Sequence, residues 1–320
     1  MIAQRKNKPV PKPVYPGSKL VKEYLEFLRQ DRGLVEATIS CRQPPARDFL
    51  NAYPEYATPS RIGRVRPQMI HEYMIKTLRL FSRPKKKMWL TGVRDFFKFL
   101  YLQGYHNRNL ANAVPTLISY SLDRIPRALS ADVVERLLDV PDRRRPIGRR
   151  DYAILLLLAT YGVRSIQVVH LRFRDLKWRE GTIRFEAHKG GKPLFFPLEK
   201  PVAEALLNYI KKDRKEISHP QVFVKHQTGP TRGNPLGREL WNMVQRHLQK
   251  IGIRAPVPSR GPHSIRHAFA TRLLAQRTPL KTIADLLGHR SLRSTFIYTK
   301  VDREQLRGLA RPWPEVSHEE

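Results

Sequence analysis

The sequence predicts a mainly α-helical protein of two domains with one small β-hairpin. Apolar residues recur every three or four positions in several segments of the first 120 residues, which is the spacing of helices with one buried face. Residues 182–186 alternate apolar and polar side chains, residues 193–198 are apolar and aromatic, and a Gly-Gly turn lies between them. With 320 residues, the chain is long enough for two domains that each bury a core.

The first domain, residues 18–120, is expected to be a small bundle of helices. Residues 19–32 carry apolar side chains at helical spacing, and Gly33 suits the turn that ends them. The same spacing returns over residues 67–81 and 88–101, with a basic connection between them, and nothing in this domain has the pattern of a strand. Residues 1–17 are basic and rich in proline, so we expect a flexible arm there.

The second domain, residues 129–300, is expected to follow a polar linker at residues 121–128. Ser130 suits the N-cap of its first helix. The apolar run over residues 150–161 predicts a buried helix that Gly162 ends, and Arg164 opens the next segment. Beyond the hairpin, the patterns predict further elements in this order: a helix at 201–214, a short strand at 221–225 and a helix at 238–251.

The charge of the chain indicates a polyanionic partner. Lys and Arg total 60 against 28 Asp and Glu, a formal net charge of +32, and the basic clusters lie within segments that are expected to fold. Double-stranded DNA is therefore the expected partner, and its binding should weaken steeply with salt. The candidates for DNA contact are Arg61, Arg64, Arg66, Lys85, Lys86, Lys87 and Lys192.

Two further features bear on the compartment. Cys41 is the only cysteine, so the chain can form no internal disulfide, which favours an intracellular protein. The longest apolar run, residues 152–163, is about half of what a membrane-spanning helix needs. We expect a cytoplasmic protein, associated with the nucleoid through DNA, that has no membrane partner.

The stretch from Pro262 to Thr299 carries the densest group of candidate catalytic residues. In a helix that Pro262 opens, His263 and Arg266 lie on one face. A second short helix should end at Gly288, directly before His289, and a third segment carries Tyr298. The turns between these segments could bring the four side chains around one ligand.

This residue set suits nucleophilic attack on a phosphodiester. The tyrosine would form a covalent phosphotyrosine, the arginine would take the charge on the nonbridging oxygens, and the imidazoles would hold the phosphate or move protons. No metal-ligand cluster, carboxylate pair or glycine-rich phosphate loop accompanies them, so we expect neither a metal nor another cofactor. Taken singly, each histidine and the tyrosine would more often be a surface residue or a satisfied core residue.

The motifs HSIRHAFAT and LLGHRSLRSTFIYT resemble the C-terminal signature of the tyrosine recombinase (phage integrase) family. That signature is H-x-x-R, then L-G-H, then a tyrosine nine residues after the second histidine, the spacing of His289 and Tyr298. Upstream, ILLLLATYGVRSIQVVHLRFRDL is similar to the family's first arginine box and FEAHKGGKPLFFPL to its lysine-bearing hairpin, in the family's order. The resemblance covers about residues 129–300.

The resemblance implies a fold and a set of roles. Residues 18–120 would be a helical, SAM-like core-binding domain that clamps DNA, and residues 129–300 a mixed α+β catalytic domain. Tyr298 would be the nucleophile, Arg164 and Arg266 would bind the nonbridging oxygens, and His263 and His289 would assist. Lys189 would protonate the leaving oxygen, with Lys192 as the alternative.

The same resemblance implies a site-specific recombinase or integrase that integrates, excises or transposes a mobile element through a 3′-phosphotyrosine. It would act as a homotetramer on DNA, and the family allows accessory DNA-bending proteins or partner recombinases. The tail, residues 301–320, would dock on a neighbouring subunit or remain a frayed terminus.

Several alternatives stay open at the level of sequence. The chain has Gln167 where the family pattern has a glutamate, so Arg164 would lack a neutralising partner, as in a DNA-binding relative that has lost catalysis. A type IB topoisomerase would use the same active-site logic as a monomer. Arg164 could be only a helix cap, and the two lysines could only touch phosphates. His263 and His267 have the spacing of zinc ligands, although no third ligand supports a zinc site.

Overall fold

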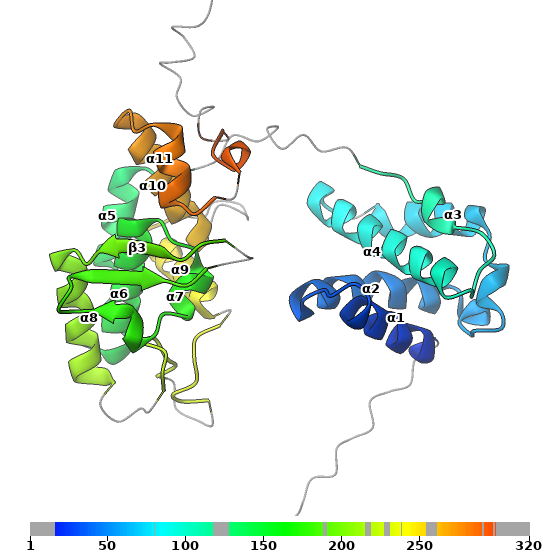
Figure 1. Ribbon diagram of the computed structural model, residues 1–320, viewed down its shortest axis with the longest axis horizontal. Coiled ribbons are helices and arrows are strands. Elements are labelled where there is room, and N and C mark those ends of the chain that lie inside the picture. The colour runs from blue at the N-terminus through cyan, green and yellow to red at the C-terminus, as the bar shows by residue number, and fades with distance from the viewer. Residues whose placement is uncertain are drawn as a thin grey trace, which may run out of the picture. The chain divides into compact units, whose positions relative to one another are not determined.

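The computed structural model describes residues 17–79, 81–117, 128–187, 191–214, 219–226, 231–237, 239–253, 261–289, 291–296 and 298. The chain divides into two compact units, Met1–Ser119 and Tyr120–Glu320. Both are mainly helical, and the second contains a small antiparallel sheet, which confirms the predicted fold class (Figure 1). The predicted flexible arm, the linker, Lys189 and the tail fall wholly or almost wholly outside the described residues.

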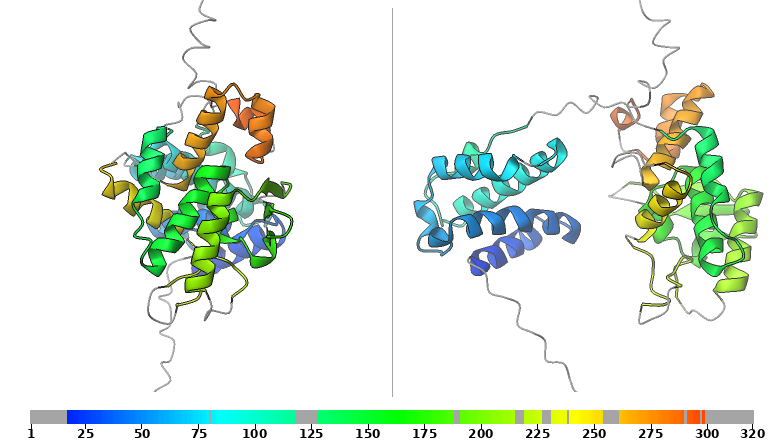
Figure 2. Two further views of the ribbon diagram at one scale, coloured as in Figure 1. Left: turned by 90° about the vertical axis from the view of Figure 1, so that its left-hand side faces the viewer. Right: turned by 180° about the vertical axis from the view of Figure 1, so that it is seen from behind.

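The first unit is, over the described residues, a bundle of four α-helices, with two short 3-10 turns between the second and third helices and another after the fourth. Its core is strongly aromatic, because Phe49 from the second helix and Phe97 from the fourth meet edge to face at 4.9 Å, with Tyr73 of the third helix against Phe49 at 5.2 Å. The right-hand view of Figure 2 shows the helices of this unit lying side by side. The elements are α1 (Ser18–Gln30), α2 (Glu36–Ala52), η1 (Pro54–Tyr56), η2 (Ile62–Arg64), α3 (Pro67–Leu78), α4 (Arg83–Leu102) and η3 (Leu110–Ala113).

Two features of this bundle differ from the sequence-based expectation. Helix α2 was not predicted, because Pro44 and Pro45 interrupt its pattern; the helix holds both, and Pro45 is buried where Gly92 of α4 leaves room for it. Helix α4 begins at Arg83, so the basic run that was expected to be a connection forms the first turns of the helix. Pro84 explains this start, since proline is well accommodated in the first helical turn.

The second unit is built around helix α6, which is buried on nearly all sides. Helices α5, α8 and α10 pack against it, and Tyr161 near its C-terminal end contacts Phe185 and Phe196 of the sheet. The elements are α5 (Ala131–Asp139), α6 (Pro146–Tyr161), α7 (Ser165–Val169), η4 (Phe173–Asp175), β1 (Leu176–Lys177), β2 (Thr182–Phe185), β3 (Leu194–Pro197), α8 (Lys200–Asp213), α9 (Glu239–Lys250), α10 (Pro262–Ala275), α11 (Leu280–Leu286) and η5 (Leu292–Ser294).

The sheet has the antiparallel order β1-β2-β3. Strands β2 and β3 pair Phe185 with Leu194, as expected for the predicted hairpin. The predicted strand at 221–225 was wrong: with the described residues, its backbone forms two isolated bridges and no ladder, one from Gln221 to Arg172 and one from Val224 to Pro235. Its apolar residues are buried, so core packing rather than a strand ladder explains the pattern.

A small apolar cluster separate from the main core closes this unit at helices α10 and α11. Its buried members are Phe269, Ala270, Leu274, Ile283, Leu287 and Tyr298. The segment that carries Tyr298 is therefore anchored on α10 and α11. In the part of the chain that the structure describes, no helix is long and apolar enough to cross a bilayer.

Candidate active site

The two predicted catalytic arginines lie close together at the ends of two helices. Helix α6 ends at Gly162, which takes the left-handed conformation (φ 59°) and turns the chain toward Arg164. The guanidinium of Arg164 donates to the backbone oxygens of Leu287 and Gly288, each at 3.3 Å, just beyond helix α11. Arg164 is thus joined to the turn that leads to His289.

Arg266 comes from α10 and reaches the same turn. Its guanidinium donates to the Gly162 oxygen at 2.8 Å and to the Leu287 oxygen. Both oxygens belong to residues that end helices, where carbonyl groups lack an intrahelical partner and carry partial negative charge. Two helix ends therefore anchor Arg266, and Arg164 and Arg266 share the Leu287 oxygen.

The site is positively charged and, among the described residues, no carboxylate is in ion-pair contact with either guanidinium. Burial, followed by repulsion from Arg164, lowers the pKa of Arg266 to about 10, so that it stays charged at neutral pH. Burial also lowers the pKa of Arg164. Two desolvated cations that no described carboxylate neutralises form a site that favours an anion.

Gln167 contacts the backbone rather than the guanidinium of Arg164. Its side-chain oxygen accepts a hydrogen bond from the Arg164 backbone N–H at 3.0 Å, and its amide group donates to the Glu186 oxygen at 3.0 Å. The side chain is buried. Gln167 therefore links the start of α7 to the end of β2 and sets the backbone from which Arg164 extends.

Tyr298 is nearly buried, with 2% of its surface exposed, and its hydroxyl lies 3.0 Å from Nδ1 of His267. The two rings are tilted by 58° with centroids 5.4 Å apart. Burial raises the pKa of the Tyr298 phenol, and the positive charges of Arg266 and Arg164 oppose that rise. The predicted nucleophile thus lies within the field of both arginines.

The two predicted catalytic histidines have different surroundings. His289 follows Gly288 and contacts the hydroxyl of buried Thr295 through Nδ1 at 2.8 Å. Burial, together with Arg266 and Arg164, lowers its pKa to about 4. His263, at the start of α10, is exposed over part of its surface; desolvation of the rest of the side chain, followed by repulsion from Arg266 and then Arg164, lowers its pKa. Both rings are therefore neutral near pH 7.

The predicted DNA-contacting residues lie on exposed parts of their own units. Lys192 is exposed just before β3. Around η2 and the start of α3 in the first unit, Arg61, Arg64 and Arg66 are exposed. On the first turns of α4, Lys85 and Lys87 are exposed and Lys86 is half-buried, with the Lys85 ammonium 3.8 Å from the centre of the Phe81 ring. The positive charges of these lysines lie at the positive end of the helix dipole and are repelled by it, so a bound anion would stabilise this end of the helix.

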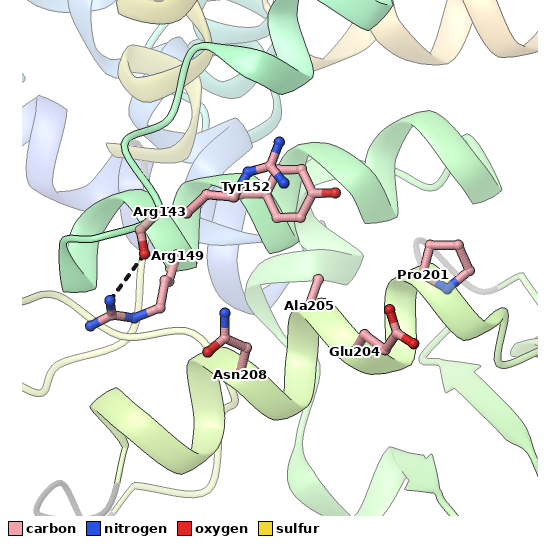
Figure 3. A pocket seen from close by; sticks show the side chains of 7 residues that line it. All are labelled: Arg143, Arg149, Tyr152, Pro201, Glu204, Ala205 and Asn208. Atoms are coloured by element: carbon pink, nitrogen blue, oxygen red, sulfur yellow. Dashed lines mark hydrogen bonds between the residues drawn. The ribbon is translucent and has the colours of Figure 1, made fainter.

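A hollow of about 210 Å³ between α6 and α8 contains none of the candidate catalytic residues. Arg143 lies over the Tyr152 ring at 4.0 Å, and its backbone oxygen accepts from Arg149 at 3.0 Å (Figure 3). Arg149 also forms a two-point ion pair with Asp213, at 2.6 and 2.7 Å. A carboxylate thus neutralises Arg149, whereas no described carboxylate pairs with Arg164 or Arg266.

The fold, and the grouping of two arginines, histidines and a tyrosine, agree with the class of protein that the sequence motifs predicted, the tyrosine recombinases. The sequence profile of the phage integrase family matches residues 127–305. The chain belongs to this family, as the sequence motifs predicted. Its function is accordingly site-specific recombination of the tyrosine recombinase type.

Individual proteins are similar to this chain in sequence or in fold. Protein y4rA of Sinorhizobium fredii, whose name marks it as a candidate integrase/recombinase, is 36% identical over 294 residues, covering 92% of this chain and 70% of its own. The tyrosine recombinase XerD of Halalkalibacterium halodurans is 30% identical over 299 residues, covering 90% and 95%. Among solved structures, XerH site-specific recombinase bound to difH substrate has a TM-score of 0.66 at 19% identity, covering 95% of this chain and 99% of that one.

One residue of the site was considered in the sequence only as a zinc ligand. His267 follows Arg266 directly and contacts Tyr298, a residue 31 positions away. The helical period predicts that residues 263, 266, 267 and 270 lie along one face of α10, so the sequence did contain a signal for His267. Its partner could not be predicted, because that depends on where the chain returns after α11.

Proposed function

We propose that this chain is a catalytically active DNA strand transferase that cuts and rejoins DNA through a 3′-phosphotyrosine at Tyr298. The observation that carries the proposal is the pair Arg164 and Arg266, which converge on one turn without a carboxylate partner among the described residues, beside a buried tyrosine hydroxyl. A catalytically silent DNA-binding protein would have no need to hold these cations next to a tyrosine.

The proposed chemistry follows from these positions. The Tyr298 oxygen attacks phosphorus. Arg164 and Arg266 each have N–H donors that are not used by the anchoring carbonyls, and these donors bind the nonbridging oxygens and stabilise the charge of the transition state. His263 and His289 donate hydrogen bonds to the phosphate or transfer protons. Lys189, with Lys192 as the alternative, protonates the departing 5′-oxygen. The energy of the broken bond stays in the ester, so the cycle needs neither ATP nor a metal.

Double-stranded DNA is the proposed partner. The net charge of +32 and the exposed arginines and lysines of both units support binding along the phosphate backbone. A homotetramer that holds two duplexes would complete strand exchange, and accessory DNA-bending proteins or partner recombinases would direct it. Integration, excision or transposition of a mobile element is the proposed outcome, with the protein held at the nucleoid by its DNA.

The test is to capture covalent protein–DNA adducts. The full chain is expressed in cells, denatured rapidly and purified, and any DNA that remains attached is sequenced. Tyr298→Phe removes only the nucleophilic oxygen and should abolish the adducts while leaving DNA affinity nearly unchanged. The matched control is Tyr152→Phe, because Tyr152 belongs to the same unit but lies at the hollow of Figure 3. This variant should still form the adducts.

The outcomes separate the alternatives. Adducts at one short sequence that disappear in Tyr298→Phe would establish the nucleophile and the target site together. Dispersed adducts would indicate topoisomerase-like activity instead. Adducts that persist in Tyr298→Phe would show that another residue is the nucleophile, and their absence from the unmodified chain would contradict catalysis under these conditions.

A further inference from the structure

We propose that His267 is the general base of this enzyme, accepting the phenol proton of Tyr298 as the tyrosine attacks the scissile phosphate. The inference rests on the proposed function, since it assigns a step of the same reaction. It rests on one contact in particular, the 3.0 Å separation of His267 Nδ1 and the Tyr298 hydroxyl oxygen. A proton-transfer partner must lie within hydrogen-bond reach of the proton that it takes, and His267 meets that condition.

The fold holds this pair together from both sides. Helix α10 places His267 one residue after Arg266, and Ala270, one turn further on, is too small to push the tyrosine away. Tyr298 is packed in the same apolar cluster as Ala270 and Phe269. The backbone N–H of Tyr298 also bonds to the Thr295 oxygen at 3.0 Å, which fixes the turn that presents the phenol.

The other two histidines of the site are placed for other tasks. His289 Nδ1 is engaged by the Thr295 hydroxyl at 2.8 Å. His263 lies one helical turn before His267 and faces solvent, where an incoming DNA phosphate would arrive. Among the described residues, His267 is therefore the imidazole that contacts the nucleophile itself.

The charges around His267 suggest how its basicity depends on DNA. Burial lowers the pKa of His267 to about 4, with further contributions from His263 and then Arg266 on the same helix. From the segment after α11, the titratable groups that face His267 are His289 and Tyr298. Without DNA the ring is thus neutral and weakly basic. A phosphodiester anion bound at Arg164 and Arg266 would offset their charge and raise the affinity of His267 for a proton.

The proton and electron balance of the step is complete. In the tautomer protonated at Nε2, His267 Nδ1 accepts the hydrogen bond of the phenol. As the bond from the Tyr298 oxygen to phosphorus forms, the phenol proton passes to Nδ1, and the bond from phosphorus to the 5′-oxygen breaks with its electron pair on that oxygen, which takes a proton from the acid lysine. In rejoining, the 5′-hydroxyl attacks phosphorus and gives its proton back to the lysine. The bond from phosphorus to the Tyr298 oxygen breaks with its electron pair on that oxygen, which recovers its proton from His267.

The experiment measures the rate of adduct formation on a duplex that carries the site recovered from the captured adducts. His267→Asn places an amide oxygen near the position of Nδ1, so it keeps a hydrogen bond to Tyr298 but cannot take a proton. We expect adduct formation to slow by about 10²-fold or more, the usual effect of removing a general base. His226→Gln is the matched control, because His226 makes a similar contact with the Tyr209 hydroxyl at 2.9 Å outside the site, and its rate should be unchanged.

Two further readouts separate a base from a residue that only positions the tyrosine. On a duplex with a 5′-bridging sulfur, which leaves without protonation, a defect in the acid lysine should be rescued, whereas His267→Asn should stay slow. The rate of the unmodified enzyme should rise with pH and level off as His267 loses its proton, whereas the rate of His267→Asn should keep rising toward the pKa of the phenol.

Each contrary result overturns the assignment. A normal rate in His267→Asn would mean that the hydrogen bond alone suffices, and rescue by the bridging sulfur would place His267 on the leaving-group side. Parallel pH profiles would assign the proton to another acceptor. If the unmodified enzyme formed no adduct, the proposed function would fail and the base assignment would fail with it. This result differs from the three above, in which the unmodified enzyme does form adducts.

Discussion

Replacing Gly162 with alanine should destabilise the second unit by about 2–5 kcal/mol, because two costs coincide at this residue. Gly162 has φ 59°, and the left-handed conformation costs a residue with a Cβ atom about 1–2 kcal/mol. The added Cβ would also lie 2.3 Å from Cδ1 of Phe269, whose ring is buried in the α10–α11 cluster and has little room to move. Forcing a methyl group into such packing costs a further 1–3 kcal/mol or so.

Gly181→Ala is the matched control for this change. Gly181 has nearly the same φ, 61°, and nothing lies within 4 Å of an added Cβ, so only the conformational cost of about 1–2 kcal/mol applies. Hydrogen exchange of the α6 amides measures the opening free energy of this unit alone. Equal losses in the two variants would refute the steric argument. Because the Gly162 oxygen also holds Arg266, adduct formation should fall in Gly162→Ala but not in Gly181→Ala.

Three further results are expected. Asp151→Ala should lower the free energy of unfolding, measured by urea denaturation, by about 3–5 kcal/mol, because the buried Asp151 carboxylate pairs with Arg150 at 2.7 Å and His247 at 3.0 Å. A loss below about 1 kcal/mol would show that these pairs are dispensable for stability. The free energy of unfolding should fall as pH is lowered from about 6.5 toward 4. The pKa values of His226, His267 and His289 are each lowered to about 4 in the folded chain, so over this range the unfolded chain binds protons that the folded chain does not. A flat profile between about pH 7 and 5 would contradict these shifts. DNA affinity, measured by fluorescence anisotropy, should drop by about 10³-fold or more between 50 and 200 mM salt, and a shallow dependence would mean that few phosphates are contacted.

Some of the fold was predictable from local pattern and some was not. Helix α6 and its end at Gly162 were predictable, because an apolar run and a left-handed glycine act over a few neighbouring residues. Helix α2 was missed, because its tolerance of Pro45 depends on the space that Gly92 leaves in another helix. The buried segment at 221–225 was mistaken for a strand, since burial and strand pairing produce the same apolar pattern.

The sequence by itself determined the family and the spacing of the candidate catalytic residues, because a helical face and the nine positions from His289 to Tyr298 are properties of the chain. Only the tertiary structure decided what each side chain contacts. Arg266 meets the Gly162 oxygen across 104 positions, Arg164 meets the Gly288 oxygen across 124, and the phenol of Tyr298 meets His267 rather than His289. Such contacts depend on how whole helices pack, and helix packing depends on side chains throughout the core rather than on any single motif.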